Sequence, residues 1–131
     1  MSNVTQLHPQ NEAPAKRTFY VLVRTDISLA QQLVQVAHAA AEAGRAFYRP
    51  EHGIASAIVL AVPGKAALLA AQAKLVARGV ATELFHEPDF GIGDSALATE
   101  PLSDEQRKLL RSWPLWRAPD ATPAALAKEA A

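Results

Sequence analysis

The chain has 131 residues, and half of them are hydrophobic, which is enough to build one domain around a buried core. It carries 13 Lys and Arg against 13 Asp and Glu, so its formal net charge is zero. This balance argues against strong non-specific affinity for nucleic acids, which rests on neutralising phosphates, but it is compatible with a local basic patch. The absence of cysteine excludes disulfides and thiolate chemistry.

The ends of the chain differ in composition from its middle. Residues 1–16 are polar and contain Pro9 and Pro14, which predicts a disordered leader without the apolar core of a signal peptide. Residues 17–117 form the predicted domain, and the Ala- and Pro-rich residues 118–131 are expected to be a flexible tail. Since no run approaches the roughly 18 apolar residues of a membrane span, we expect a cytoplasmic protein with no membrane partner.

Short apolar runs alternate with longer helical patterns along the predicted domain. The expected elements, in chain order, are strand 18–23, helix 29–46, strand 55–62, helix 65–78, strand 80–85, strand 95–99 and helix 104–112. Ser28 is the expected N-cap of the first helix, Gly79 ends the second, and Ser103 with Gln106 forms a capping box at the third. This order predicts an α/β fold of three layers, α/β/α, with a four-stranded mixed sheet.

The first helix has two faces of different character. One repeats apolar residues at helical spacing and is predicted to be the buried stripe: Leu29, Leu33, Val36, Ala37 and Ala40. The other repeats polar residues: Gln31, Gln35, His38, Glu42 and Arg45. A solvated helix face usually carries Lys and Glu, so amides and an imidazole at its start are unusual. The stripe rises from the loop after the first strand, where open α/β proteins place their sites.

These residues resemble the type-2 peptidyl-tRNA hydrolase family. The family has Arg-x-Asp after its first strand and Ala-Gln-x-x-His-Ala on the following helix, and this chain has matching segments at 23–27 and 34–39, with Val34 in place of the first Ala. The family's second signature is an Asp-x-Gly loop before a final strand that ends near a Pro. Here Asp89-Phe90-Gly91 precedes residues 95–101. The resemblance covers roughly residues 17 to 101.

The resemblance implies a compact α/β fold that hydrolyses the ester between a peptide and the 3′ end of tRNA, with peptidyl-tRNA or another RNA end as partner. It implies no metal or other cofactor. Asp89 would polarise the attacking water as a general base. The remaining predicted site residues are His38 and Gln31 for catalysis, and Arg24, Asp26, Gln35 and Ser95 for substrate binding.

One position departs from the family in a way that matters chemically. Gln31 lies four residues before Gln35, where the family has a Lys implicated in catalysis. A neutral amide forms hydrogen bonds of about half the strength of those from an ammonium group. The alternative function is therefore a catalytically degenerate relative that binds RNA, a nucleotide or a protein. A third possibility is a small-molecule hydrolase on the same scaffold.

Several of the candidates also have a structural interpretation. Asp26 could be a turn residue with Arg24 as its ion-pair partner. His38 could be buried on a backbone carbonyl or paired with Glu42. Asp89 could form a turn with its own backbone.

The sequence holds no other recognised site. The four histidines are dispersed outside any recognised metal-ligand spacing, and no serine sits in a nucleophile elbow. Trp113 and Trp116 are expected to fasten the C-terminal segment to the sheet, with base stacking as the alternative. Lys108, Arg111 and Arg117 form a small basic rim or compensate helix ends. An Ala-rich helix face could serve a homodimer as well as a core.

Overall fold

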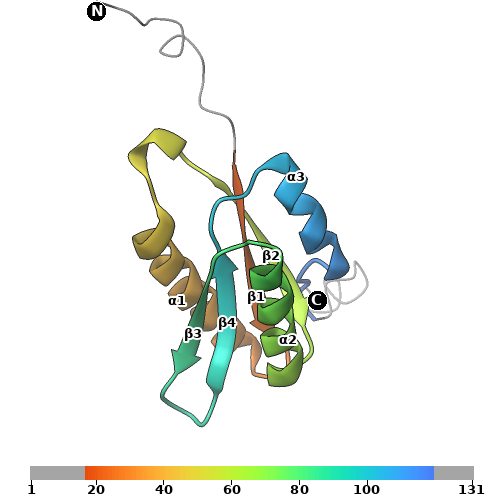
Figure 1. Ribbon diagram of the computed structural model, residues 1–131. Helices are drawn as coiled ribbons and strands as arrows, with labels where there is room; N and C mark the ends of the chain where they lie inside the picture. Colours follow the sequence, from red (N-terminus) through yellow and green to blue (C-terminus); the bar gives the residue numbers. More distant parts are fainter. Residues whose placement is uncertain (1–16, 120–131) are drawn as a thin grey trace, which may run out of the picture.

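The computed structural model describes residues 17–119 (Figure 1). The predicted leader and the residues of the predicted tail beyond 119 lie outside this range. The elements are β1 (Thr18–Arg24), α1 (Leu29–Phe47), the 3-10 helix η3 (Pro50–His52), β2 (Ser56–Val62), α2 (Lys65–Ala77), β3 (Thr82–Glu87), β4 (Gly93–Thr99), α3 (Asp104–Arg107) and the 3-10 helix η4 (Lys108–Ser112).

The four strands form one mixed sheet in the order β2-β1-β4-β3. β1 pairs in parallel with β2, with α1 as the connection between them, and β4 runs antiparallel to both β1 and β3. Helix α1 covers one face of the sheet, and α2 with α3 and η4 covers the other (Figure 1). The predicted α/β fold with a four-stranded mixed sheet and helices on both faces is confirmed.

The central position of β1 in the sheet explains why its sequence is almost continuously apolar. Tyr20 and Leu22 point into the core beneath α2 and η4, and Val21 and Val23 point into the core beneath α1. Both faces of this strand are therefore buried, as expected for a strand with helices on either side. Leu22 lies opposite Leu97 of β4, and both are fully buried.

The prediction of the buried face of α1 was largely wrong. Leu33 is 58% exposed and Leu29 is also exposed, whereas Gln35 is fully buried together with Gln32, Ala39 and Ala43. Of the predicted stripe only Val36 and Ala40 pack partly against the sheet. The physical reason is that small alanines bring the helix close to the strands, and the two buried amides find hydrogen-bond partners there.

The segment after η4 fastens itself to the free edge of β2. Ala61 donates its backbone N–H to the carbonyl of Pro114, and Trp116 donates its own to Val59, both at 2.9 Å. Trp113 packs into the core on the α2 side, and Trp116 packs into the core on the α1 side. The predicted fastening role of the two tryptophans is confirmed.

Local end signals were predicted better than strand boundaries. The Ser28 cap and the capping box of Ser103 with Gln106 are present, and Gly79 ends α2 with a φ of 82°. The third strand begins and ends two residues later than predicted, so His86 and Glu87 belong to it and not to the loop. No helix in residues 17–119 is long and apolar enough to cross a membrane.

The reversed face of α1 yields the first prediction. Leu33→Gln should change the free energy of unfolding by no more than about 0.5 kcal/mol, since its side chain is already exposed. Ala39→Leu should destabilise the fold by about 1–3 kcal/mol, because its added methylene groups must enter a closed helix–sheet contact. Urea denaturation of both variants measures the two effects. A larger loss for Leu33→Gln would contradict the observed orientation of α1.

Candidate functional site

The centre of the site is a buried amide on α1. The Gln35 side chain is fully buried, and its Nε2 donates to Oε1 of Glu87 at 2.7 Å and to Oε1 of Gln31 at 3.1 Å. Its Oε1 accepts from the Ser95 hydroxyl at 2.6 Å. One amide therefore connects α1 to the end of β3 and the start of β4, and every polar atom of that amide has a partner.

A β-bulge aims Ser95 at this amide. Phe85 lies opposite Ala96 but the next residue, His86, lies opposite Asp94, so Ser95 is the extra residue in β4. Successive side chains in a regular strand point to opposite faces. Ser95 and Ala96 both face α1, which is possible only because the bulge re-aims one of them. The Ser95 hydroxyl also lies within 3.3 Å of the Phe85 carbonyl.

Glu87 is the site residue that the sequence analysis missed. Its carboxylate is 7% exposed and accepts from Gln35 through Oε1 and from the backbone N–H of Asp89 through Oε2. The Gln35 hydrogen bond, followed by that of Asp89, lowers the pKa of Glu87 below its ordinary value of 4.5. The carboxylate is therefore ionised at neutral pH and fixes both the amide and the beginning of the β3–β4 turn.

Arg24 ties the end of β1 to the same turn. Its Nη1 donates to the carbonyls of Ile92 and Asp94 at 2.8 and 3.0 Å, and its Nε and Nη2 form a bidentate pair with Asp26 at 2.9 Å. The pair raises the pKa of Arg24 and lowers that of Asp26. The carboxylate of Asp26 also lies against the Gly64 turn, where an added Cβ would be 3.4 Å from its Oδ2. The ion pair between Arg24 and Asp26 is confirmed.

The β3–β4 turn presents Asp89 and Phe90 to solvent. Phe90 and Gly91 have φ values of 60° and 65°, and Ile92 donates its N–H to the Asp89 carbonyl at 3.3 Å. Positive φ values at both central residues of a hydrogen-bonded turn define type I′. Phe is unusual as the first of these two central residues, which is typically Asn, Asp or Gly. Phe90 is 80% exposed. Within residues 17–119 the Asp89 carboxylate accepts no hydrogen bond, so it is free to meet water or a ligand.

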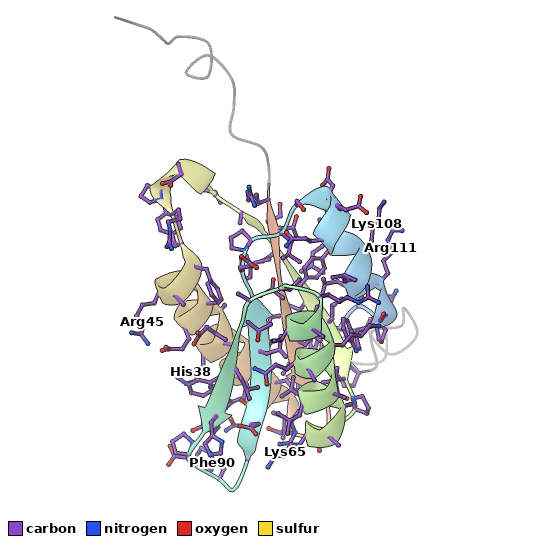
Figure 2. The ribbon with its side chains drawn as sticks, in the orientation of Figure 1. His38, Arg45, Lys65, Phe90, Lys108 and Arg111 are labelled. Atoms are coloured by element: carbon purple, nitrogen blue, oxygen red, sulfur yellow. The ribbon has the colours of Figure 1, made fainter. Side chains whose placement is uncertain are left out.

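His38 on α1 is a further exposed side chain of the candidate site, in addition to Asp89 and Phe90. The His38 ring stacks on Phe85, with centroids 4.4 Å apart and planes within 2°. The His38 side chain is exposed, which excludes the alternative that it is buried against a backbone carbonyl. Glu42 pairs with Arg45 and not with His38. Figure 2 shows His38 and Phe90 at the same end of the molecule.

The structure thus places the predicted residues in three groups. Gln31, Gln35 and Ser95 join Glu87 in the hydrogen-bonded network, with Gln35 and Ser95 closed off from solvent. Arg24 and Asp26 brace the adjacent turn, and Asp89 and His38 stand at the surface. The described residues contain no group of three or more His, Asp or Glu side chains placed to hold a metal ion.

Comparison with known proteins identified no relative of this chain among protein families or curated proteins.

The lowered pKa of Glu87 gives a pH-dependent prediction. Its folded-state pKa lies below the unfolded value, so its charge stabilises the fold above about pH 4.5 and this contribution is lost as pH falls through the folded pKa. Glu87→Gln should therefore be less stable than the parent at pH 7, with a difference that shrinks below pH 4.5. Denaturation between pH 3 and 7 measures it. A matched Glu51→Gln variant, which removes an exposed carboxylate on η3, should be as stable as the parent at pH 7.

The Phe90 backbone gives a second prediction. A left-handed conformation costs a residue with a side chain about 1–2 kcal/mol, and glycine avoids this cost. Phe90→Gly should raise the free energy of unfolding by about 1 kcal/mol, part of the relief being offset by the greater freedom of glycine in the unfolded chain. Phe90→Ala keeps the strained Cβ and should leave stability within about 0.5 kcal/mol of the parent. Equal effects of the two variants would contradict backbone strain.

Proposed function

We propose that the protein is a divergent relative of the type-2 peptidyl-tRNA hydrolases and hydrolyses the ester that joins a peptide to the 3′ end of tRNA. The observation that carries the proposal is the Gln35 network. It brings the helix bearing Gln31, Gln35 and His38 against the strand end that leads to Asp89. The two segments that carry the family resemblance therefore lie side by side, and this proximity supports the proposal.

In this proposal Asp89 is the general base. Its exposed carboxylate takes a proton from water as the water oxygen attacks the ester carbonyl. Glu87 holds the backbone N–H of Asp89 and thereby fixes where the base stands. Gln35 and Ser95 are positioning residues, because both are buried and bonded to each other.

Gln31 is the candidate donor to the developing oxyanion. Its Oε1 accepts from Gln35, which leaves its NH2 group without a hydrogen bond to any other residue between 17 and 119. An oriented neutral donor stabilises an oxyanion, but less than a charged one. A protonated His38 at the surface then gives a proton to the ribose oxygen as the ester bond breaks, and the proton that Asp89 took from water returns to solvent.

The alternative is a relative that binds an RNA end, a nucleotide or a protein without turnover. Two observations favour it. Gln31 is uncharged, and the site contains the carboxylates of Asp26, Glu87, Asp89 and Asp94, of which only Asp26 is paired with the guanidinium of Arg24. Both observations weigh against turnover of a tRNA ester, and the carboxylates favour a protein or an uncharged nucleoside over a polyanionic RNA end as the ligand.

Hydrolysis of N-acetyl-aminoacyl-tRNA by the purified protein tests the proposal. Turnover should fall about 10²–10⁴-fold in Asp89→Ala, the range expected for loss of a general base. Glu51→Ala, which removes an exposed carboxylate on η3, should retain full activity. Gln31→Lys should raise the rate, because an ammonium donor is stronger.

The outcomes separate the two functions. Turnover that survives in Asp89→Ala would exclude this mechanism. No turnover in the folded parent combined with turnover in Gln31→Lys would support the degenerate relative. The salt dependence of the reaction distinguishes tRNA from a small ester, since only the polyanion should lose affinity steeply as salt rises.

A further inference from the structure

A concave surface lies on the other side of the sheet from α1. It is a groove of about 470 Å³ between the α3–η4 segment and the strands β1 and β2, a volume within the range of small-molecule sites. Its floor is apolar and aromatic: Tyr20 and Leu60 are almost fully buried there, and Trp113 is the half-buried ring that a ligand can reach. Lys108 and Arg111 line this groove, and Figure 2 shows both residues on the α3–η4 segment, at the opposite end of the molecule from Phe90.

One helical side supplies all the charges of the groove. Asp104, Arg107, Lys108 and Arg111 follow the spacing i, i+3, i+4, i+7, and all four line it. Lys108 pairs with Glu105 and Arg107 lies 4.0 Å from Asp104, both at the surface. In the described part of the chain Arg111 makes neither an ion pair nor a hydrogen bond. Three cations therefore face the groove with one carboxylate among its lining residues.

The walls of the groove are already fixed by bonds of their own. Arg107 donates from Nε to the Tyr20 hydroxyl at 2.9 Å, which holds its guanidinium beside the floor. Lys74 donates to the Ser112 hydroxyl at 2.7 Å and lies 5.3 Å from the centre of the Trp113 ring. The segment after Trp113 is bonded to the edge of β2. A ligand would thus enter a largely preformed site and spend little free energy on ordering it.

We propose that this groove binds a nucleoside monophosphate unit, either as a free nucleotide or as part of a single-stranded RNA. A flat base suits the aromatic and apolar floor, and a phosphate suits the row of Arg107, Lys108 and Arg111. Asp104 can accept hydrogen bonds from ribose hydroxyls and disfavours a second anion beside it. A nucleoside monophosphate combines an aromatic ring with an anion, and the groove combines an aromatic floor with a row of cations. The site is separate from the Gln35 network and does not require catalysis there.

Binding of adenosine 5′-monophosphate by the full chain, measured by calorimetry at low salt, tests the inference. Arg111→Ala should weaken binding about tenfold, the loss expected for one charge-assisted hydrogen bond. Trp113→Leu should weaken it about tenfold through lost stacking. Because Trp113 also packs in the core, Arg111→Glu on the intact tryptophan provides a second test and should abolish binding. Arg78→Ala removes an exposed cation at the end of α2 and should leave binding unchanged.

Further ligands identify the source and decide the result. Tetra-adenylate that binds tenfold or more tightly than the monophosphate, with a steep salt dependence, would identify an RNA strand, and equal affinities would identify a free nucleotide. The inference is overturned if neither ligand binds, if adenosine binds as well as its monophosphate, or if Arg78→Ala weakens binding as much as Arg111→Ala. Binding of an acidic peptide without nucleotide binding would also overturn it. Asp89→Ala should bind adenosine 5′-monophosphate as tightly as the parent. Failure of the esterase assay would therefore not affect the test of nucleotide binding.

Discussion

The buried amide of Gln35 is the constraint on which the rest of the site depends. Leaving a buried amide without partners costs about 1–3 kcal/mol, so its position is fixed by where a carboxylate and a hydroxyl are available. Glu87 and Ser95 provide them from two neighbouring strands, and the bulge at Ser95 is needed to do so. The place of Asp89 follows, since its backbone N–H is bonded to the other oxygen of Glu87. The same hydrogen-bond network therefore determines both how closely α1 packs on the sheet and where the candidate base lies.

The two faces of the sheet differ in how closely their helices approach. The α2 side is filled with leucines, whereas the α1 side is built largely from alanines: Ala39, Ala43, Ala96 and Ala98. Small side chains allow short distances between helix and strand, which lets glutamine side chains reach partners across the interface. A helical wheel assigns leucine to the core and glutamine to solvent, so it gave the wrong face for α1. Hydrophobic spacing predicts an amphipathic helix but carries no information about buried hydrogen-bond partners on distant strands.

The same division between local and distant information explains what the sequence could predict. Caps and stops depend on residues within one turn, and the predictions for Ser28, Ser103 and Gly79 are confirmed. The alternation of apolar runs with helical patterns was sufficient for the fold class. The bulge at Ser95 depends on the register between β3 and β4, and the role of Glu87 depends on contact with a helix more than fifty residues earlier. No local pattern encodes either, so the sequence placed Glu87 in a loop and left it without a role.

A net charge of zero conceals an uneven distribution of charge. The end of the sheet with the candidate site carries four carboxylates, Asp26, Glu87, Asp89 and Asp94, with the cations Arg24 and Lys65, whereas the groove by η4 carries three cations with one carboxylate. An anionic ligand is drawn toward the second surface and away from the first. Turnover of a tRNA ester at Asp89 would therefore need contacts beyond electrostatic attraction. Phe90, exposed and held in a left-handed conformation beside Asp89, is suited to supply one. Its ring gains little by burial and its backbone is strained, which is typical of a residue retained for contact with a ligand.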